Sequence, residues 1–99
     1  MQSITILGAT GSIGRSTLDV IGQHPDKYSV FALTGQSQLK LLAQQSVEFN
    51  AKYAVVTDEA SAKQLSQIIK DLKGQTEVLF GEQALCDVAS SSQVQVVMA

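Results

Sequence analysis

The residues best suited to chemistry lie in the run GATGSIG at positions 8–14, directly after an apolar run at positions 3–7. Gly8 would let a strand turn tightly, Gly11 would let the backbone approach a pyrophosphate, and Gly14 would let the next helix pack closely. The free N–H groups and the positive dipole end of that helix favour phosphate. This pattern predicts the phosphate-binding turn of a dinucleotide site.

The glycine spacing is G-x-x-G-x-x-G rather than the usual G-x-G-x-x-G, so its meaning depends on a strand before it and a helix after it. Ile13, Thr17, Val20 and Ile21 recur at helical spacing, which predicts the buried stripe of that helix. The alternative interpretation is a strand-to-helix turn that binds no ligand.

The segment after the second expected strand indicates which dinucleotide would bind. NAD-binding versions of this turn place an Asp or Glu there, whereas this chain has no carboxylate between that strand and Glu48. Gln38 can donate hydrogen bonds, Lys40 can add charge, and Ser37 could begin the next helix as a further anion site. These residues favour NADP over NAD, unless they serve only as a helix cap.

Other reactive residue types lack the partners that chemistry needs. His24 has no acid, Cys or second His at metal-ligand spacing, and Cys86 stands among apolar neighbours that predict core packing. Asp58 and Glu59 precede an apolar helical pattern, where acids favour the helix dipole and Thr57 or Asp58 can cap. We therefore expect no catalytic residue and no metal ligand in this chain.

The elements that would position the turn alternate between strand and helix signals. Strands are expected at about 3–7, 28–33, 53–56, 76–80 and 94–98, and helices at about 12–23, 38–49, 58–73 and 81–90. This rhythm predicts one α/β domain over residues 1–99, a Rossmann-like doubly wound parallel sheet with strand order 3-2-1-4-5. Its ligand would lie at the carboxyl ends of strands one and four.

Composition narrows the class of protein. Hydrophobic residues make up 44% of the 99 residues, charged residues 16%, and the net charge is −2, which indicates neither nucleic-acid nor membrane-surface binding. The single cysteine excludes an internal disulfide and fits a cytoplasmic protein. Because a parallel strand needs covering helices and the chain stops after its fifth strand, we expect the first part of a longer protein.

The run ILGATGSIGRSTLDVI at residues 6–21 closely resembles the start of the 1-deoxy-D-xylulose-5-phosphate reductoisomerases. The core T-G-S-I-G-x-S-T-L-D is fairly specific to that family. The likeness covers essentially the whole chain and continues through residues 24–25, 28–33, 48–49, 53–55 and 76–81.

The resemblance implies an NADPH-dependent enzyme that converts 1-deoxy-D-xylulose 5-phosphate to 2-C-methyl-D-erythritol 4-phosphate in non-mevalonate isoprenoid biosynthesis. It implies a Mg or Mn ion held outside this chain, a homodimer, and a bacterial cytoplasmic location. The cofactor contacts that it implies are Thr10, Gly11, Ser12, Ile13, Ser37 and Gln38.

One departure and two alternatives accompany this resemblance. The family often shows Gly-Lys-Asn where this chain has Gln36-Ser37-Gln38, which removes a positive charge near the expected 2′-phosphate. A G-A-T-G turn also opens aspartate-semialdehyde dehydrogenases, and a non-catalytic nucleotide-binding module is the third interpretation. We expect these 99 residues alone to be inactive.

Overall fold

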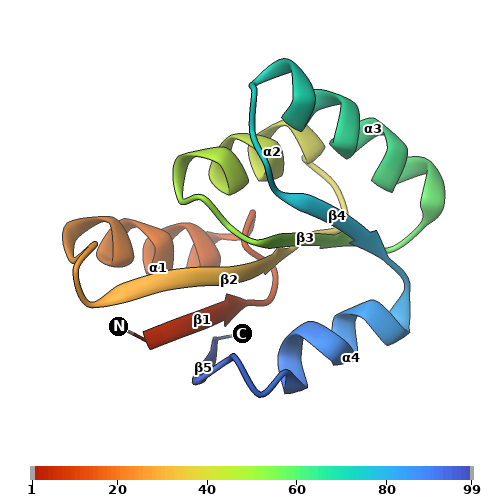
Figure 1. Ribbon diagram of the computed structural model, residues 1–99. Helices are drawn as coiled ribbons and strands as arrows, with labels where there is room; N and C mark the ends of the chain where they lie inside the picture. The colour runs from red at the N-terminus through yellow and green to blue at the C-terminus, as the bar shows by residue number, and fades with distance from the viewer. Residues whose placement is uncertain (1, 99) are drawn as a thin grey trace.

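The computed structural model describes residues 2–98, in which parallel strands alternate with helices (Figure 1). The strands are β1 (Gln2–Ile6), β2 (Tyr28–Thr34), β3 (Tyr53–Val56), β4 (Glu77–Phe80) and β5 (Val96–Met98). The helices are α1 (Ser12–Gln23), α2 (Leu39–Glu48), α3 (Glu59–Asp71) and α4 (Glu82–Ser90). The expected rhythm of elements is therefore confirmed.

The strand order is β4-β3-β2-β1-β5, so the predicted order 3-2-1-4-5 is wrong. β4 pairs in parallel with β3, from Glu77 beside Tyr53 to Phe80 beside Val56. The sheet thus grows by one more strand in the same direction before the chain returns to place β5 beside β1. With right-handed crossovers, each new parallel strand is added in the same direction along the sheet as long as the connecting helices pack on the same face. The face on which α3 packs therefore decides whether β4 continues this direction or reverses it.

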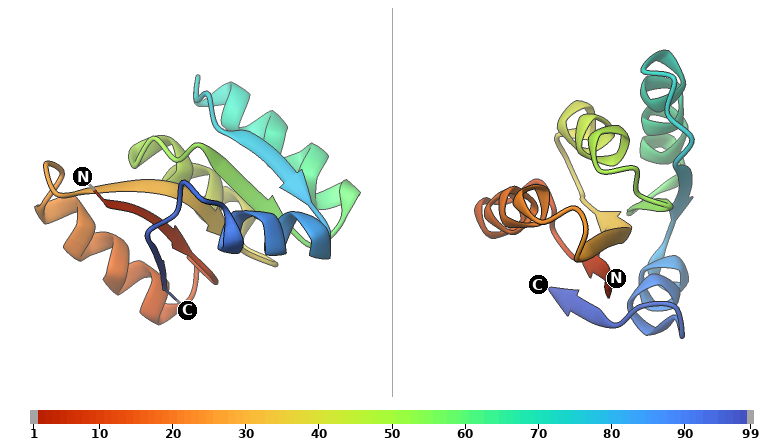
Figure 2. Two further views of the ribbon diagram at one scale, coloured as in Figure 1. Left: turned by 60° about the horizontal axis from the view of Figure 1, so that its bottom comes forward. Right: turned by 60° about the vertical axis from the view of Figure 1, so that its left-hand side comes forward.

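The sheet is covered on both faces. Figure 2 shows α1, α2 and α3 on one side and α4 on the other. Ile4, Ile6 and Leu33 belong to the larger core under the first three helices, whereas Phe31 and Val88 belong to the smaller core under α4. This separation is typical of a doubly wound sheet.

One hydrogen bond joins α4 to β1. The hydroxyl of Thr5, which is fully buried in β1, donates to the carbonyl oxygen of Val88 at 2.8 Å. A buried hydroxyl needs such a partner, and the last turn of α4 provides it.

The buried face of α1 differs from the predicted stripe. Gly14, Leu18 and Ile21 face the core, whereas Ile13 and Val20 are 68% and 53% exposed. Only Ile21 of the predicted apolar set is therefore correctly placed. One position along a helix is a turn of about 100°, so the apolar periodicity, to which Gly14 adds no side chain, was misplaced around the helix, whereas the close packing predicted at Gly14 itself marks the buried face.

Candidate functional site

The glycine turn is held against the end of β2. Gly8 has a left-handed φ of +71°, as expected for a tight turn. Its N–H donates to Oγ1 of Thr34 at 2.9 Å, and the N–H of Ala9 donates to the carbonyl oxygen of Thr34 at 2.8 Å. A single residue of the second strand therefore satisfies two consecutive amides of the turn.

Gly14 is required by close packing. A Cβ at this position would lie 2.5 Å from the carbonyl oxygen of Gly8 and 2.6 Å from the Cα of Ala9. The prediction of close approach is confirmed, although the partner is the backbone of the turn rather than the strand. Gly11 is different, because its φ is −77° and a Cβ there would come no closer than 3.4 Å to any atom.

The amino end of α1 carries free donors. Within residues 2–98, no acceptor takes the backbone N–H of Thr10, Ser12 or Ile13, and Gly11 occupies the N-cap without a side-chain capping bond. These amides and the positive end of the α1 dipole form a surface that suits an anion.

The segment after β2 lies beside the turn. Gln36, Ser37 and Gln38 are exposed, and Gln38 has a left-handed φ of 52° at the N-cap of α2. The helix begins at Leu39, so the expectation that Ser37 begins it is wrong. The left-handed residue redirects the chain there and brings the partly buried Leu39 against the core.

The turn and this segment share one cavity of about 660 Å³ at the carboxyl ends of the strands. Thr10, Gly11, Ser37 and Gln38, four of the six expected cofactor contacts, line it together. Ser12 and Ile13 instead line an adjoining groove on α1 of about 340 Å³.

Sequence reasoning missed part of the cavity wall. These further residues come from the end of β2, the residue after β3, and α4: Thr34, Gly35, Thr57, Leu85, Cys86 and Ala89. Cys86 is exposed, so the prediction that it packs in the core is wrong. Its helix buries Val88 instead, and no sequence signal placed α4 beneath the turn.

The order of the sheet also changes the neighbours of the site. The reversal lies between β1 and β5, where the N–H of Leu7 donates to the carbonyl oxygen of Met98 at 2.8 Å. The strand order therefore reverses at strand one, as expected, but beside β5 rather than beside strand four. β4 lies at the far edge of the sheet.

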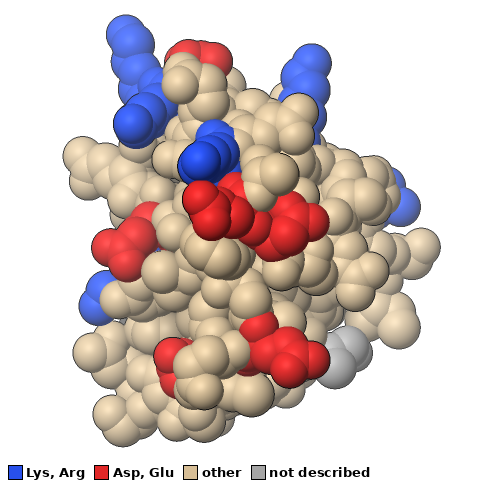
Figure 3. All heavy atoms as spheres, turned by 90° about the vertical axis from the view of Figure 1, so that its right-hand side faces the viewer, with Lys and Arg blue, Asp and Glu red and all other residues tan. Residues whose placement is uncertain are grey.

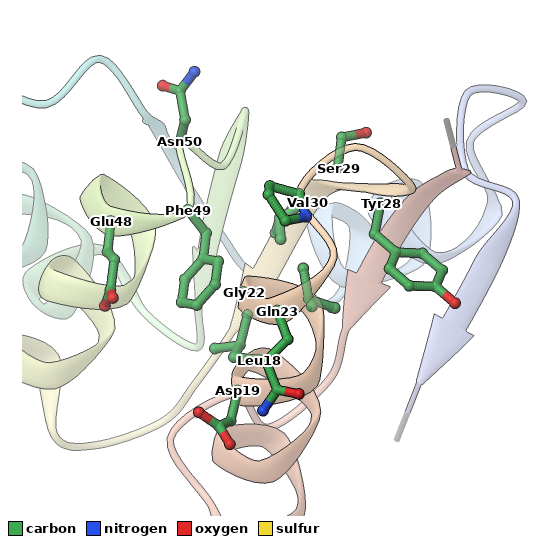
Figure 4. A pocket seen from close by; sticks show the side chains of 12 residues that line it. Leu18, Asp19, Gly22, Gln23, Tyr28, Ser29, Val30, Glu48, Phe49 and Asn50 are labelled. Carbon is green, nitrogen blue, oxygen red and sulfur yellow. The ribbon is translucent and has the colours of Figure 1, made fainter.

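A second cavity of about 650 Å³ lies between the carboxyl ends of α1 and α2 (Figure 4). Asp19 and Glu48 line it with Phe49 and Tyr28, and its wall, as far as the described part of the chain forms it, contains no Lys or Arg. Two carboxylates and two negative helix ends repel a pyrophosphate. Among residues 2–98, no charged side chain lines the cavity at the glycine turn, so this cavity suits an anion better.

Two acidic side chains that follow β3 have structural partners. Figure 3 shows Asp and Glu in separate patches on one side of the molecule, with uncharged surface between them. Asp58 caps α3 by accepting the N–H of Ser61 at 2.7 Å, and hydrogen bonds from Ser61 lower the pKa of its carboxyl group. Glu59 pairs with Lys63 at 3.3 Å on the same helix.

The sequence pattern of the 1-deoxy-D-xylulose 5-phosphate reductoisomerases matches residues 4–99. The chain belongs to this family. The resemblance noted in the sequence is therefore confirmed, and the alternative of a semialdehyde dehydrogenase is wrong. The glycine turn at positions 8–14 lies within the residues that match this family.

Curated reductoisomerases are similar over the whole chain. The reductoisomerase of Saccharophagus degradans is 59% identical and that of Pseudomonas fluorescens 52% identical, each over 99 residues and 100% of this chain. The chain spans 25% of the length of these relatives.

Solved reductoisomerases share the fold. A DOX-P reductoisomerase in complex with NADPH, fosmidomycin and magnesium aligns with a TM-score of 0.90 at 41% identity, covering 98% of this chain and 24% of that one. The Zymomonas mobilis reductoisomerase in complex with NADPH aligns with a TM-score of 0.84 at 38% identity, covering 93% and 24%.

The described residues contain neither a cluster of metal-ligating side chains nor a membrane-spanning helix. Between residues 2 and 98, no three His, Cys, Asp or Glu side chains gather in a way that could hold a metal ion. Over the same residues, none of the helices has the length and apolar character needed to cross a membrane.

Proposed function

We propose that this chain is the NADPH-binding domain of a reductoisomerase that converts 1-deoxy-D-xylulose 5-phosphate to 2-C-methyl-D-erythritol 4-phosphate. The observation that carries the proposal is the uncharged cavity at the glycine turn in a chain whose residues 4–99 match this family. NADPH, when bound, supplies the hydride for the reductive step. The rest of the enzyme, including the metal ligands, lies outside this chain.

The residues of the turn would hold the pyrophosphate. The N–H groups of Thr10, Ser12 and Ile13 are free to donate, and Gly11 keeps the backbone open where the anion would approach. Support for this placement comes from the helix dipole and from the uncharged character of the described residues that line the cavity.

Ser37 and Gln38 would contact the 2′-phosphate of the adenosine ribose. Both are exposed at the rim of the same cavity, and both can donate hydrogen bonds. Neither carries a positive charge, so this contact relies on neutral donors. We propose NADPH as the preferred cofactor, with Mg or Mn and a sugar phosphate bound by the remainder of a cytoplasmic homodimer.

The test uses the whole enzyme that contains this chain. We expect consumption of NADPH that requires 1-deoxy-D-xylulose 5-phosphate and Mg²⁺, and saturable binding of NADPH to the enzyme alone. Failure to bind NADPH would overturn the proposal, and preference for NADH would overturn the assignment of the cofactor. The isolated 99 residues should show no turnover, and any measurable turnover would contradict our placement of the catalytic groups elsewhere.

A further inference from the structure

Gln45 makes a buried contact with the glycine turn from outside the cavity. This side chain lies on α2, is 6% exposed, and donates from Nε2 to the carbonyl oxygen of Ala9 at 3.0 Å. Its Oε1 atom is also buried and has no partner among the described residues. Neither cavity wall described above includes Gln45.

Packing alone does not explain an amide at this position. A buried acceptor without a hydrogen bond costs about 1–3 kcal/mol. A methionine of similar length would fill the same space beneath the turn without that cost. The contact that only the amide makes is the hydrogen bond to Ala9.

This bond controls the direction of the next amide. The peptide unit between Ala9 and Thr10 is planar and trans, so its carbonyl oxygen and its N–H point in opposite directions. With the carbonyl held toward α2, the N–H of Thr10 must point away from α2, and Thr10 lines the cavity. A reversed peptide would present an oxygen atom to a bound anion.

In the part of the chain that the structure describes, the other hydrogen bonds of the turn do not involve the carbonyl oxygen of Ala9 or the N–H of Thr10. The N–H of Ala9 is tied to Thr34, and the N–H of Gly11 donates to the carbonyl oxygen of Gly8 at 3.0 Å. Among the described residues, Gln45 alone donates to the carbonyl oxygen of Ala9. Within residues 2–98, the Gln45 side chain is therefore the one hydrogen-bond donor that holds this peptide in its observed direction.

We propose that Gln45 is a positioning residue that fixes the Ala9–Thr10 peptide and so aims the Thr10 N–H at the cofactor pyrophosphate. The proposal rests on the proposed function, because it assigns this amide to NADPH. Gln45 itself touches no cofactor. Its effect is on the affinity for NADPH and not on the chemical step.

The test compares Gln45→Met with Gln44→Met in the whole enzyme. Gln44 lies next to it on the same helix and is exposed, so it provides a matched control. We expect Gln45→Met to raise the KM for NADPH about tenfold, the scale of one lost hydrogen bond to a charged group, with kcat and the KM for the sugar phosphate unchanged. Gln44→Met should match the wild type.

Gln45→Glu adds a pH-dependent readout. A glutamic acid side chain donates to the Ala9 carbonyl only when protonated, and burial raises the pKa of its carboxyl group. The affinity of this variant for NADPH should therefore fall as pH rises through that pKa, relative to the wild type. A pH profile identical to that of the wild type would overturn the proposal.

The outcomes separate the two hypotheses. A wild-type enzyme that does not bind NADPH overturns the proposed function and this inference together. If the wild type binds NADPH and Gln45→Met has the same KM as Gln44→Met, only the role of Gln45 is overturned. Loss of affinity that accompanies a large fall in melting temperature in both Gln45 variants would also overturn it, in favour of a purely structural role.

Discussion

The hydroxyl of Thr34 accepts the N–H of Gly8 at 2.9 Å, which joins the end of β2 to the first residue of the glycine turn. Removing this acceptor leaves a partly buried amide unpaired. We expect Thr34→Val to lower the free energy of unfolding by about 1–3 kcal/mol and to weaken NADPH binding. Urea unfolding and NADPH titration measure both effects.

Thr34→Ser is the matched control, because serine keeps the hydroxyl group at this position. It should retain most of the stability and the affinity. Equal losses in Thr34→Val and Thr34→Ser would show that the methyl group, rather than the hydrogen bond, is responsible.

Two glycines of the same turn should respond differently to a methyl group. Gly14→Ala places a Cβ 2.5 Å from the Gly8 carbonyl oxygen, so we expect unfolding to become easier by about 1–3 kcal/mol. Gly11→Ala meets nothing closer than 3.4 Å, so its cost to folding should be about 1 kcal/mol or less. Chemical denaturation of both variants tests this order.

Gly11→Ala should nevertheless weaken NADPH binding, since its methyl group would stand where the pyrophosphate approaches the backbone. The measurement is the dissociation constant for NADPH in the folded variant. An unchanged constant would contradict the assignment of Gly11 to the phosphate site.

Ser37→Lys should strengthen discrimination for the 2′-phosphate. An exposed ammonium–phosphate pair contributes about 0.2–1 kcal/mol, so we expect the KM for NADPH to fall by up to about fivefold while the KM for NADH stays unchanged. Gln44→Lys carries the same added charge on the exposed side of α2 and serves as the control. An equal effect in both variants would indicate a general charge effect.

Cys86 offers a chemical probe of the cavity. Its thiol is exposed and lines the cavity with Thr10 and Ser37. Bound NADPH should therefore slow its alkylation roughly in proportion to the occupied fraction of the enzyme. Mass spectrometry of the peptide that contains Cys86 measures the rate. Unchanged alkylation at saturating NADPH would place the cofactor elsewhere.

The cap of α3 predicts a pH-dependent contribution to stability. Hydrogen bonds from Ser61 hold the pKa of the Asp58 carboxyl group below its ordinary value of 3.8. The ionised cap therefore stabilises the fold above pH 3.8, and this contribution is lost as pH falls through the lowered pKa. Asp58→Ala should lower the urea midpoint at neutral pH and have progressively less effect in acid.

Asp58→Asn separates the hydrogen bond from the charge, because asparagine is an equally good N-cap that does not titrate. It should keep the neutral-pH midpoint close to that of the wild type. A loss as large as that of Asp58→Ala would show that charge, and not the cap, stabilises α3.

Several local features could be predicted from the sequence because they depend on near neighbours. The bounds of α1 and of β3 are those expected, and the cap at Asp58 and the tight turn at Gly8 follow from residue type. Glycine spacing and the absence of an acid after β2 favoured an NADP site, which stays a prediction, and four of the six contacts that the resemblance implies share one cavity. The resemblance to the reductoisomerases rested on the same local motif.

The tertiary structure determined the features that depend on contacts between segments far apart in the sequence. Strand order followed from α3 packing on the same face as α2, which moved the reversal to β5 and brought α4, with Cys86, beneath the turn. Periodicity shows that a helix has an apolar face, but not which face of the sheet that helix will cover. The bond from Gln45 to Ala9 likewise exists only because α2 packs over the turn, so residues 36 positions apart meet.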